Sequence, residues 1–256
     1  MKTGFLITAR MGSSRLKDKH FLLINGKPIL LVLIKRICNM FMDQILRGIS
    51  QIIIASPDTP DSDIFNSIAP GIVSVFRGSS NNIPLRHLQA SDMHDCDVII
   101  SIDGDDPLCS VDGMMKVQKA IFSGEEYAKT SDLPLGMNSI GYSREFLRKS
   151  VMPYIDHILE NGWGWIFDKS KLMNIIIGSI SDNQKLRFTL DYQEDYIFFK
   201  NLIEPLGEEI RTISDIDIVE RVVSKKLYEL NEKVADEYWN NFNQKQKCEM
   251  GNEKRL

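Results

Sequence analysis

The stretch FLITARMGSSRLKDK, residues 5–19, joins a short apolar run to a loop that is rich in positive charge. The run from Phe5 to Ala9 is typical of a buried β-strand, and the loop from Thr8 to Lys19 follows it directly. In parallel sheets, ligands bind at the carboxyl ends of the strands. If more strands follow with helices between them, this stretch predicts an α/β fold with a parallel sheet and a ligand-binding site in the loop after its first strand.

Farther along the chain, short β-branched runs alternate with longer amphipathic stretches. Further strands are predicted at 51–55, 72–76 and 97–102, and helices at 28–42, 61–68, 84–93 and 111–122. Strands separated by helices are joined by right-handed crossovers, which place them in one mostly parallel sheet with both faces covered. We therefore predict a single α/β domain.

The second half of the chain has a looser pattern. Residues 173–181 are predicted to be extended, and helices are predicted at 192–203 and 215–231. From about residue 240 the chain is rich in Asn, Gln, Lys and Glu, which predicts a frayed polar tail. No internal repeat or low-complexity linker divides the sequence, so one domain remains the preferred interpretation.

Composition excludes several classes of protein. The 256 residues carry 31 Lys and Arg against 35 Asp and Glu, a formal charge of −4. Binding to nucleic acid or to an anionic membrane needs a net basic face, so neither partner is expected. No run approaches the roughly 20 apolar residues of a membrane span, and no secretion signal is present. The four cysteines lack metal-ligand spacing, which predicts reduced thiols in a cytoplasmic protein.

The loop after the first strand is a candidate phosphate-binding site. Arg10, Arg15 and Lys19 supply three cations, while Gly12, Ser13 and Ser14 offer hydroxyl groups and backbone N–H groups for phosphate oxygens. The pattern is neither that of a P-loop nor that of a dinucleotide-binding loop. The alternative is a solvated, charge-rich surface loop.

A second motif, IISIDGDDPL, covers residues 99–108 and places Asp103, Asp105 and Asp106 at the end of an apolar strand. Three neighbouring carboxylates repel one another unless a cation or a positive loop neutralises them. Mg²⁺ prefers such oxygen ligands together with substrate phosphates. We expect one of the three to be a ligand and the others to support it. The alternative is an acidic turn in which Asp103 or Asp106 caps the next helix.

A third motif, LRFTLDYQED, covers residues 186–195 and predicts a short strand that runs into a helix. Asp191 stands where a helix N-cap is expected, and Glu194 three residues later suggests a capping box. A purely structural role for Asp191 is therefore one interpretation. The other is that Asp191 completes a metal site with Asp105.

Together these motifs resemble the cytidylyltransferases related to spore-coat polysaccharide biosynthesis protein F, and more distantly the CMP-Kdo and CMP-sialic acid synthetases. The resemblance runs from about residue 3 to 205 and is also carried by FRGS at 76–79. It implies a single-domain nucleotidyltransferase of glycosyltransferase-A-like, Rossmann-like fold, with a central, mostly parallel sheet flanked by helices. We place this domain at 1–240, with a flexible tail at 241–256. A homodimer is the family-level expectation.

The resemblance also implies roles for particular residues. Arg10, Lys19 and Asp105 would be catalytic, with Arg10 and Lys19 on the triphosphate. The nucleotide would be bound by Ala9, Arg10, Gly12, Ser13, Ser14, Arg15 and Lys19, with Arg77 and Ser79 at the cytosine and ribose. Mg²⁺ would be held by Asp105 and Asp191, and the acceptor would contact Asn138 and Arg187.

The expected reaction transfers CMP from CTP to a small acidic acceptor, an acidic sugar, and releases pyrophosphate. Two departures from the family pattern keep alternatives open. Lys17 and Asp18 replace the usual Pro-Gly, and the stretch 136–141 lacks its usual carboxylate. The alternatives are a non-sugar acceptor, such as a phosphonate or an alcohol phosphate, and a catalytically silent nucleotide-binding protein.

Two further features weigh less. His20, His87, His94 and His157 are scattered and are interpreted as packing or surface residues. The run Gly162-Trp163-Gly164-Trp165 could stack on a ring or form a dimer contact, although core packing is the preferred interpretation.

Overall fold

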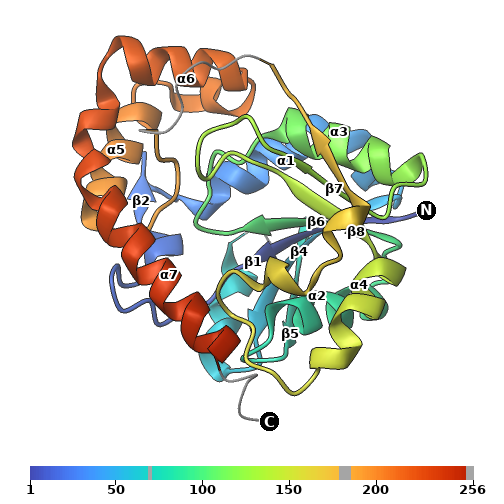
Figure 1. Cartoon of the computed structure of the whole chain (residues 1–256). Coiled ribbons are helices and arrows are strands. Elements are labelled where there is room, and N and C mark those ends of the chain that lie inside the picture. Colours follow the sequence, from blue (N-terminus) through green and yellow to red (C-terminus); the bar gives the residue numbers. More distant parts are fainter. Residues whose placement is uncertain (69–70, 179–185, 252–256) are drawn as a thin grey trace.

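The computed structural model describes residues 1–68, 71–178 and 186–251. Its main sheet has seven strands in the order β5-β4-β1-β6-β8-β7-β9 (Figure 1). Their bounds are β1 Thr3–Thr8, β4 Ser50–Pro57, β5 Val73–Gly78, β6 Val98–Asp103, β7 Tyr127–Thr130, β8 Ile140–Ser143 and β9 Leu172–Ile175. The strands β5, β4, β1 and β6 are mutually parallel, and β8 is antiparallel to both of its neighbours. The predicted mostly parallel sheet is confirmed.

The helices α1 Leu30–Leu46, α2 Ile83–Met93, α3 Val111–Phe122 and α4 Arg144–Val151 cover the two faces of this sheet. The helices α5 Gln193–Ile203, α6 Asp215–Ser224 and α7 Ala235–Gly251 lie to one side of it (Figure 1). Alternate residues of a strand point to opposite faces. Accordingly Phe5 and Ile7 pack in the same apolar cluster as residues of α1 and α3, and Leu6 packs with residues of α2 and α4. This two-sided burial explains why the strands are apolar throughout.

The register of β1 places the first two motifs side by side. Thr8 is opposite Asp103 of β6 and opposite Ala55 of β4, so the three strands end at the same edge. The chain leaves β1 through the loop 9–18, reaches the short 3-10 helix η1 (Lys19–Phe21), and returns through the hairpin β2 (Leu23–Ile24) and β3 (Lys27–Pro28). The helix α1 begins at Leu30 rather than 28, because Pro28 pairs with Leu23.

The helix predicted at 61–68 is present as a 3-10 helix, η2 (Pro60–Ser67). Two other local predictions are corrected by the structure. Residues 186–190 form no strand of the sheet; one isolated bridge joins Arg187 to Leu135, and Leu190 N–H donates to Asp105 O at 2.7 Å. The helix predicted at 215–231 ends at Ser224, because Lys226 adopts a positive φ of 53° before the short 3-10 helix η8, Leu227–Leu230.

The end of the chain also differs from its prediction. Within the described residues, the segment expected to fray from about 240 is helical, because α7 runs without interruption from Ala235 to Gly251. In Figure 1, α7 extends from the side of α5 and α6 toward the mark of the C-terminus. Of the extended segment predicted at 173–181, residues 173–175 belong to β9, and 179–181 lie outside the described residues.

A second apolar cluster joins the C-terminal helices to the edge of the sheet. Phe188, Leu190 and residues of α5 and α6 pack with Leu16 of the loop and with Leu108, which follows β6. The third motif is thereby packed beside the first two. No helix within the described ranges is long and apolar enough to cross a membrane.

Candidate active site

A cleft opens at the carboxyl ends of β1 and β6, and the charged loop forms one of its walls. Gly12 has a φ of 78°, and Asp18 adopts a left-handed conformation with a φ of 51° just before η1. These turns fold the loop back over the strand ends. Nine of the residues predicted from the sequence line this cleft: Ala9, Arg10, Gly12, Ser13, Ser14, Arg15, Lys19, Asp105 and Asp191.

Lys19 lies between the two carboxylates that were predicted to meet. Its Nζ donates to an Oδ of Asp105 and, at 3.1 Å, to Oδ1 of Asp191. The Lys19 side chain is only 11% exposed. Burial alone would lower the pKa of Lys19, but the charges of Asp105 and Asp191 raise it above its ordinary value. Residues far apart in sequence are therefore brought together as expected, with an ammonium group between them.

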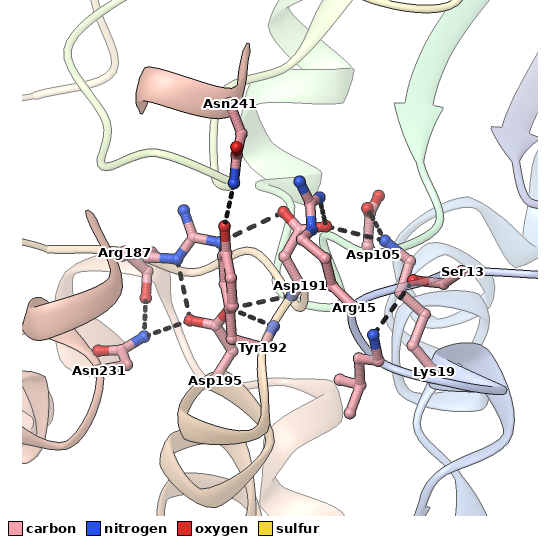
Figure 2. A network of polar contacts seen from close by, with 11 residues as sticks. Ser13, Arg15, Lys19, Asp105, Arg187, Asp191, Tyr192, Asp195, Asn231 and Asn241 are labelled. Atoms are coloured by element: carbon pink, nitrogen blue, oxygen red, sulfur yellow. Dashed lines mark hydrogen bonds and ion pairs between the residues drawn. The ribbon is translucent and has the colours of Figure 1, made fainter. Parts of the chain in front are cut away.

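Asp191 is surrounded by positive charge. Its Oδ1 accepts from Arg15 Nη2 at 2.6 Å as well as from Lys19, and its Oδ2 accepts from Arg187 Nη2 at 3.2 Å. Burial acts to raise the pKa of Asp191, but Lys19 and Arg15 outweigh it and lower that pKa to about 2. Figure 2 shows Arg15 and Lys19 on one side of this carboxylate and Arg187 on the other.

A buried network behind Asp191 fixes its position. Arg187 Nε donates to Asp195 Oδ1 at 2.9 Å, and Asn231 Nδ2 donates to the same oxygen at 2.9 Å (Figure 2). The other oxygen of Asp195 accepts from the backbone N–H groups of Asp191 at 2.9 Å and Tyr192 at 3.0 Å. Asp195 thus holds the first turn of α5.

This network corrects the capping prediction. Tyr192, not Asp191, is the N-cap of α5, and Asp195 rather than Glu194 is the acidic partner. Arg187 is 2% exposed and does not line the cleft. Its placement does not support the predicted contact with an acceptor, because the side chain holds Asp191 and Asp195 from behind. We regard Arg187 as a positioning residue.

For the other two aspartates of the second motif, Lys19 and Thr189 offset the opposing effects only in part. Desolvation and the neighbouring charge of Asp105 raise the pKa of Asp103, which lines the cleft, to about 7. The pKa of Asp106 is raised for the same reasons, with Asp103 adding to the effect. Neither aspartate caps the following helix, because Ser110 is the N-cap of α3. The acidic residues do form a turn, with Asp106 N–H donating to Asp103 O at 3.0 Å, but the helix-capping role in that interpretation is wrong.

The structure does not bring Arg77 and Ser79 to the cleft. Both line a separate hollow beside β5, where Arg77 Nη1 contacts Asp63 at 2.7 Å and its Nη2 contacts Asp58 at 3.0 Å. The link to the cleft is indirect, since Arg86 Nε donates to the carbonyl oxygen of Ser79 at 2.7 Å and Arg86 lines the cleft. The predicted contacts of Arg77 and Ser79 with cytosine and ribose remain a prediction.

Asn138 lies at a second hollow, next to the cleft. Its Nδ2 donates to Leu133 O at 2.7 Å, and its Oδ1 accepts from Thr130 Oγ1 at 3.1 Å, so its amide holds the preceding turn. Asp103 and Trp163 line both the cleft and this hollow, as do Gly162 and Phe242. The two spaces therefore share a boundary, and the contact of Asn138 with an acceptor remains a prediction.

The buried histidines have packing roles, as expected. His87 Nε2 is 2.8 Å from Thr8 Oγ1 and its Nδ1 is 2.9 Å from Tyr142 Oη. Burial lowers the pKa of His87 to about 3 and that of His20 to about 4. Both imidazoles are therefore neutral at pH 7, and they support the end of β1 and the turn after β6.

Sequence reasoning missed several residues that line the cleft. Arg86 lies within a helix, so that nothing in its local pattern marked it as a ligand-binding residue. Phe242 and Lys245 of α7 fell in the segment whose polar composition predicted a tail from about residue 240, and Tyr238 lies just before it. The useful signal was the spacing of 238, 242 and 245, which places them on one face of a helix.

A parallel sheet whose strand ends carry a loop with three cations opposite a group of carboxylates defines a nucleotidyltransferase-like α/β protein. A sequence model of the family described as cytidylyltransferase matches residues 5–213, and the chain belongs to this family.

Individual relatives agree with this assignment. The chain is 26% identical over 212 residues to the spore coat polysaccharide biosynthesis protein SpsF of Bacillus subtilis, across 80% of this chain and 87% of that protein. It is 30% identical over 129 residues to the 3-deoxy-manno-octulosonate cytidylyltransferase 2 of Hydrogenovibrio crunogenus, across 50% of this chain and 49% of that protein. A solved cytidylyltransferase from Leptospira borgpetersenii superposes with a TM-score of 0.74 at 25% identity, covering 90% of this chain and 98% of that one.

Proposed function

We propose that this chain transfers CMP from CTP to an acidic sugar and releases pyrophosphate. The observation that carries the proposal is the meeting of Arg10, Arg15 and Lys19 with Asp105 in one cleft at the end of a parallel sheet. Membership of the cytidylyltransferase family supports CTP as the donor. The proposed use of a nucleoside triphosphate supports a cytoplasmic location.

In the proposed reaction an acceptor oxygen attacks the α-phosphorus of CTP and forms a new P–O bond. The bond from the α-phosphorus to the oxygen that bridges it to the β-phosphate breaks, and pyrophosphate leaves. The protein contributes mainly positioning and charge neutralisation. In this proposal Arg10 and Lys19 would bind the triphosphate, and Gly12, Ser13 and Ser14, which line the same cleft, would offer it backbone and hydroxyl donors.

We propose Mg²⁺ as the cofactor, held by one or two carboxylates together with the phosphates of the substrate, since no set of three or more His, Cys, Asp or Glu side chains among the described residues is arranged to hold a metal ion. Asp103, Asp105 and Asp106 gather carboxylates at the end of β6, where desolvation and the charge of Asp105 raise the pKa of Asp103 and Asp106. Oxygen donors of this kind suit Mg²⁺, which would neutralise charge on the phosphates when bound. Asp105 is the proposed principal ligand. Asp191 can join it only by giving up part of its contact with Lys19.

The second hollow supports a sugar as the acceptor. Trp163 and Phe242 offer aromatic surfaces that can pack against the apolar face of a ring, and Asp103 and Asp106 can accept from ring hydroxyls. No basic residue lines this hollow among the described residues. The acid group of a sugar, like a phosphonate or phosphate group, would therefore have to point toward the cations of the cleft, and it is the aromatic surfaces that favour a sugar ring.

The experiment that tests the proposal measures pyrophosphate release. Purified protein with Mg²⁺ is given each of the four nucleoside triphosphates together with a panel of acidic sugars. We expect release with CTP and one class of acidic sugar, and strong thermal stabilisation by CTP alone. Equal stabilisation by ATP and CTP would contradict the base preference. Release with an alcohol phosphate but with no sugar would contradict the acceptor class.

A further inference from the structure

Helix α7 lies beyond the residues that match the family, which end at 213, yet it contacts both sides of the cleft. On one side, the ring of Tyr238 lies over Arg187, with 4.2 Å between the guanidinium carbon and the ring centroid. On the other side, Gln246 Nε2 donates to Gly162 O at 3.1 Å. The helix therefore bridges the Asp191 network and the segment that begins at residue 160.

Lys245 lies on this inward face, one helical turn before Glu249. Glu249 accepts from the backbone N–H of Asn161 at 3.0 Å, and the neighbouring Glu160 contacts Arg10 Nη1 at 3.2 Å. Arg10 is the first basic residue of the charged loop. Lys245 lines the same cleft as these residues, so α7 places an ammonium group opposite the loop.

The other basic residues of the cleft are already engaged. Arg10 pairs with Glu160, and Arg15 and Lys19 pair with carboxylates. Arg86 donates to the carbonyl oxygens of Ser79 and Ser80. Across residues 1–68, 71–178 and 186–251, Lys245 is the basic cleft residue for which the structure gives no hydrogen bond or ion pair. Its charge is available to a ligand.

We propose that Lys245 binds the phosphate groups of the nucleotide, as a cation that α7 adds to the family's cleft. The inference rests on the proposed function. A triphosphate brings about four negative charges, and most of the positive charge in the cleft is offset by its own carboxylates. A compact ammonium group is suited to phosphate oxygens. Gly12, Ser13 and Ser14 line the same cleft and offer further donors to the same group.

The test compares Lys245→Met with Lys247→Met by calorimetric titration of CTP in Mg²⁺. Lys245 and Lys247 are both exposed and lie on the same helix about 160° apart, but Lys247 does not line the cleft, so its variant removes the same charge at a neighbouring position. We expect Lys245→Met to weaken CTP binding about five- to tenfold, less so at high salt, and Lys247→Met to change it by less than about twofold. Both variants should melt at the temperature of the unmodified chain, and Lys245→Arg should retain most of the affinity.

The outcomes separate the two proposals. Absence of CTP binding by the unmodified chain overturns the proposed function and the role of Lys245 with it. Normal CTP binding by the chain and by Lys245→Met overturns only the role of Lys245. If Lys245→Met binds CTP normally and loses turnover with an acidic sugar, the lysine binds the acceptor rather than the nucleotide, and the inference is wrong.

Discussion

Replacing Arg187 by Met should destabilise the protein while leaving the cleft lining chemically intact. Arg187 is 2% exposed and its partner Asp195 is 0% exposed. Removing one member of a buried pair leaves an uncompensated charge, which costs about 3–5 kcal/mol of the free energy of unfolding. Asp195 keeps its contacts with Asn231 and with two backbone N–H groups, so the lower end of that range applies.

The expected shift can be expressed as a melting temperature. In a domain of about this size, each kcal/mol changes the melting temperature by roughly 2–4 °C. A loss of about 3 kcal/mol therefore predicts a decrease of about 6–12 °C. The assay is thermal unfolding followed by circular dichroism, in parallel with denaturant titration. Arg47→Met is the matched control, because Arg47 forms an exposed pair with Asp43 and should cost less than about 1 kcal/mol.

Refutation of this reasoning is straightforward. A difference in melting temperature of roughly 2 °C corresponds to about half a kcal/mol or more in a domain of this size. If Arg187→Met melts within about 2 °C of Arg47→Met, the buried network does not hold α5 in place. If it also raises KM for the acceptor and leaves KM for CTP unchanged, Arg187 contacts the acceptor, as the sequence alone predicts. Arg187→Lys should be intermediate in stability, because a single ammonium group cannot reproduce the contacts of the guanidinium group.

Three further predictions concern charge in and near the cleft. Arg10→Met should lower kcat/KM by about tenfold or more without changing the melting temperature, because its pair with Glu160 is partly exposed; unchanged turnover would remove Arg10 from the site. EDTA should abolish pyrophosphate release, with activity restored by Mg²⁺, and Asp105→Asn should need much more Mg²⁺ or stay inactive; full activity in EDTA would exclude the proposed cofactor. Stability should fall as pH is lowered from about 6.5 toward 4, because the pKa values of His20 and His87 are depressed in the folded state and both side chains protonate more readily in the unfolded chain. The slope of melting temperature against pH should be smaller in His87→Gln, and an unchanged slope would contradict this account.

The sequence predicts the sheet well because burial on both faces leaves an unambiguous pattern. The strands ending at Thr8 and Asp103 are apolar runs, and their shared edge follows from the parallel arrangement, so the meeting of the loop with Asp105 could be foreseen. Asp191 also reaches this edge, but through the bond of Leu190 N–H to Asp105 O rather than through the strand predicted before it. The partner of each charge was harder to foresee, since ion pairs depend on side-chain direction as well as on strand order.

The errors have physical reasons of their own. A short alternating run such as 186–190 predicts a strand, but its backbone bonds go to Leu135 and Asp105 instead of to a neighbouring strand. The helix α7 was not predicted because its sequence is mostly polar, and residues that contact the rest of the protein, such as Tyr238 and Gln246, are spaced among exposed polar residues. The resemblance implied an acceptor contact for Arg187, but a resemblance in sequence does not reveal burial, and the side chain is 2% exposed.

The network around Asp191 determines when, during translation, the site can form. Ribosomes add about 5–20 residues per second from the N-terminus, so the 216 positions between Arg15 and Asn231 are translated over roughly 10–40 s. Asp105 is added 90 residues after Arg15, and until Asn231 follows, the charged loop and Asp105 exist without the complete buried network that holds Asp191 in place. A nascent chain that stops at residue 213 holds all of the segment matched to the family, yet it lacks Asn231 and α7. The cleft therefore matures late in translation, and the sheet can fold well before the site on its edge is complete.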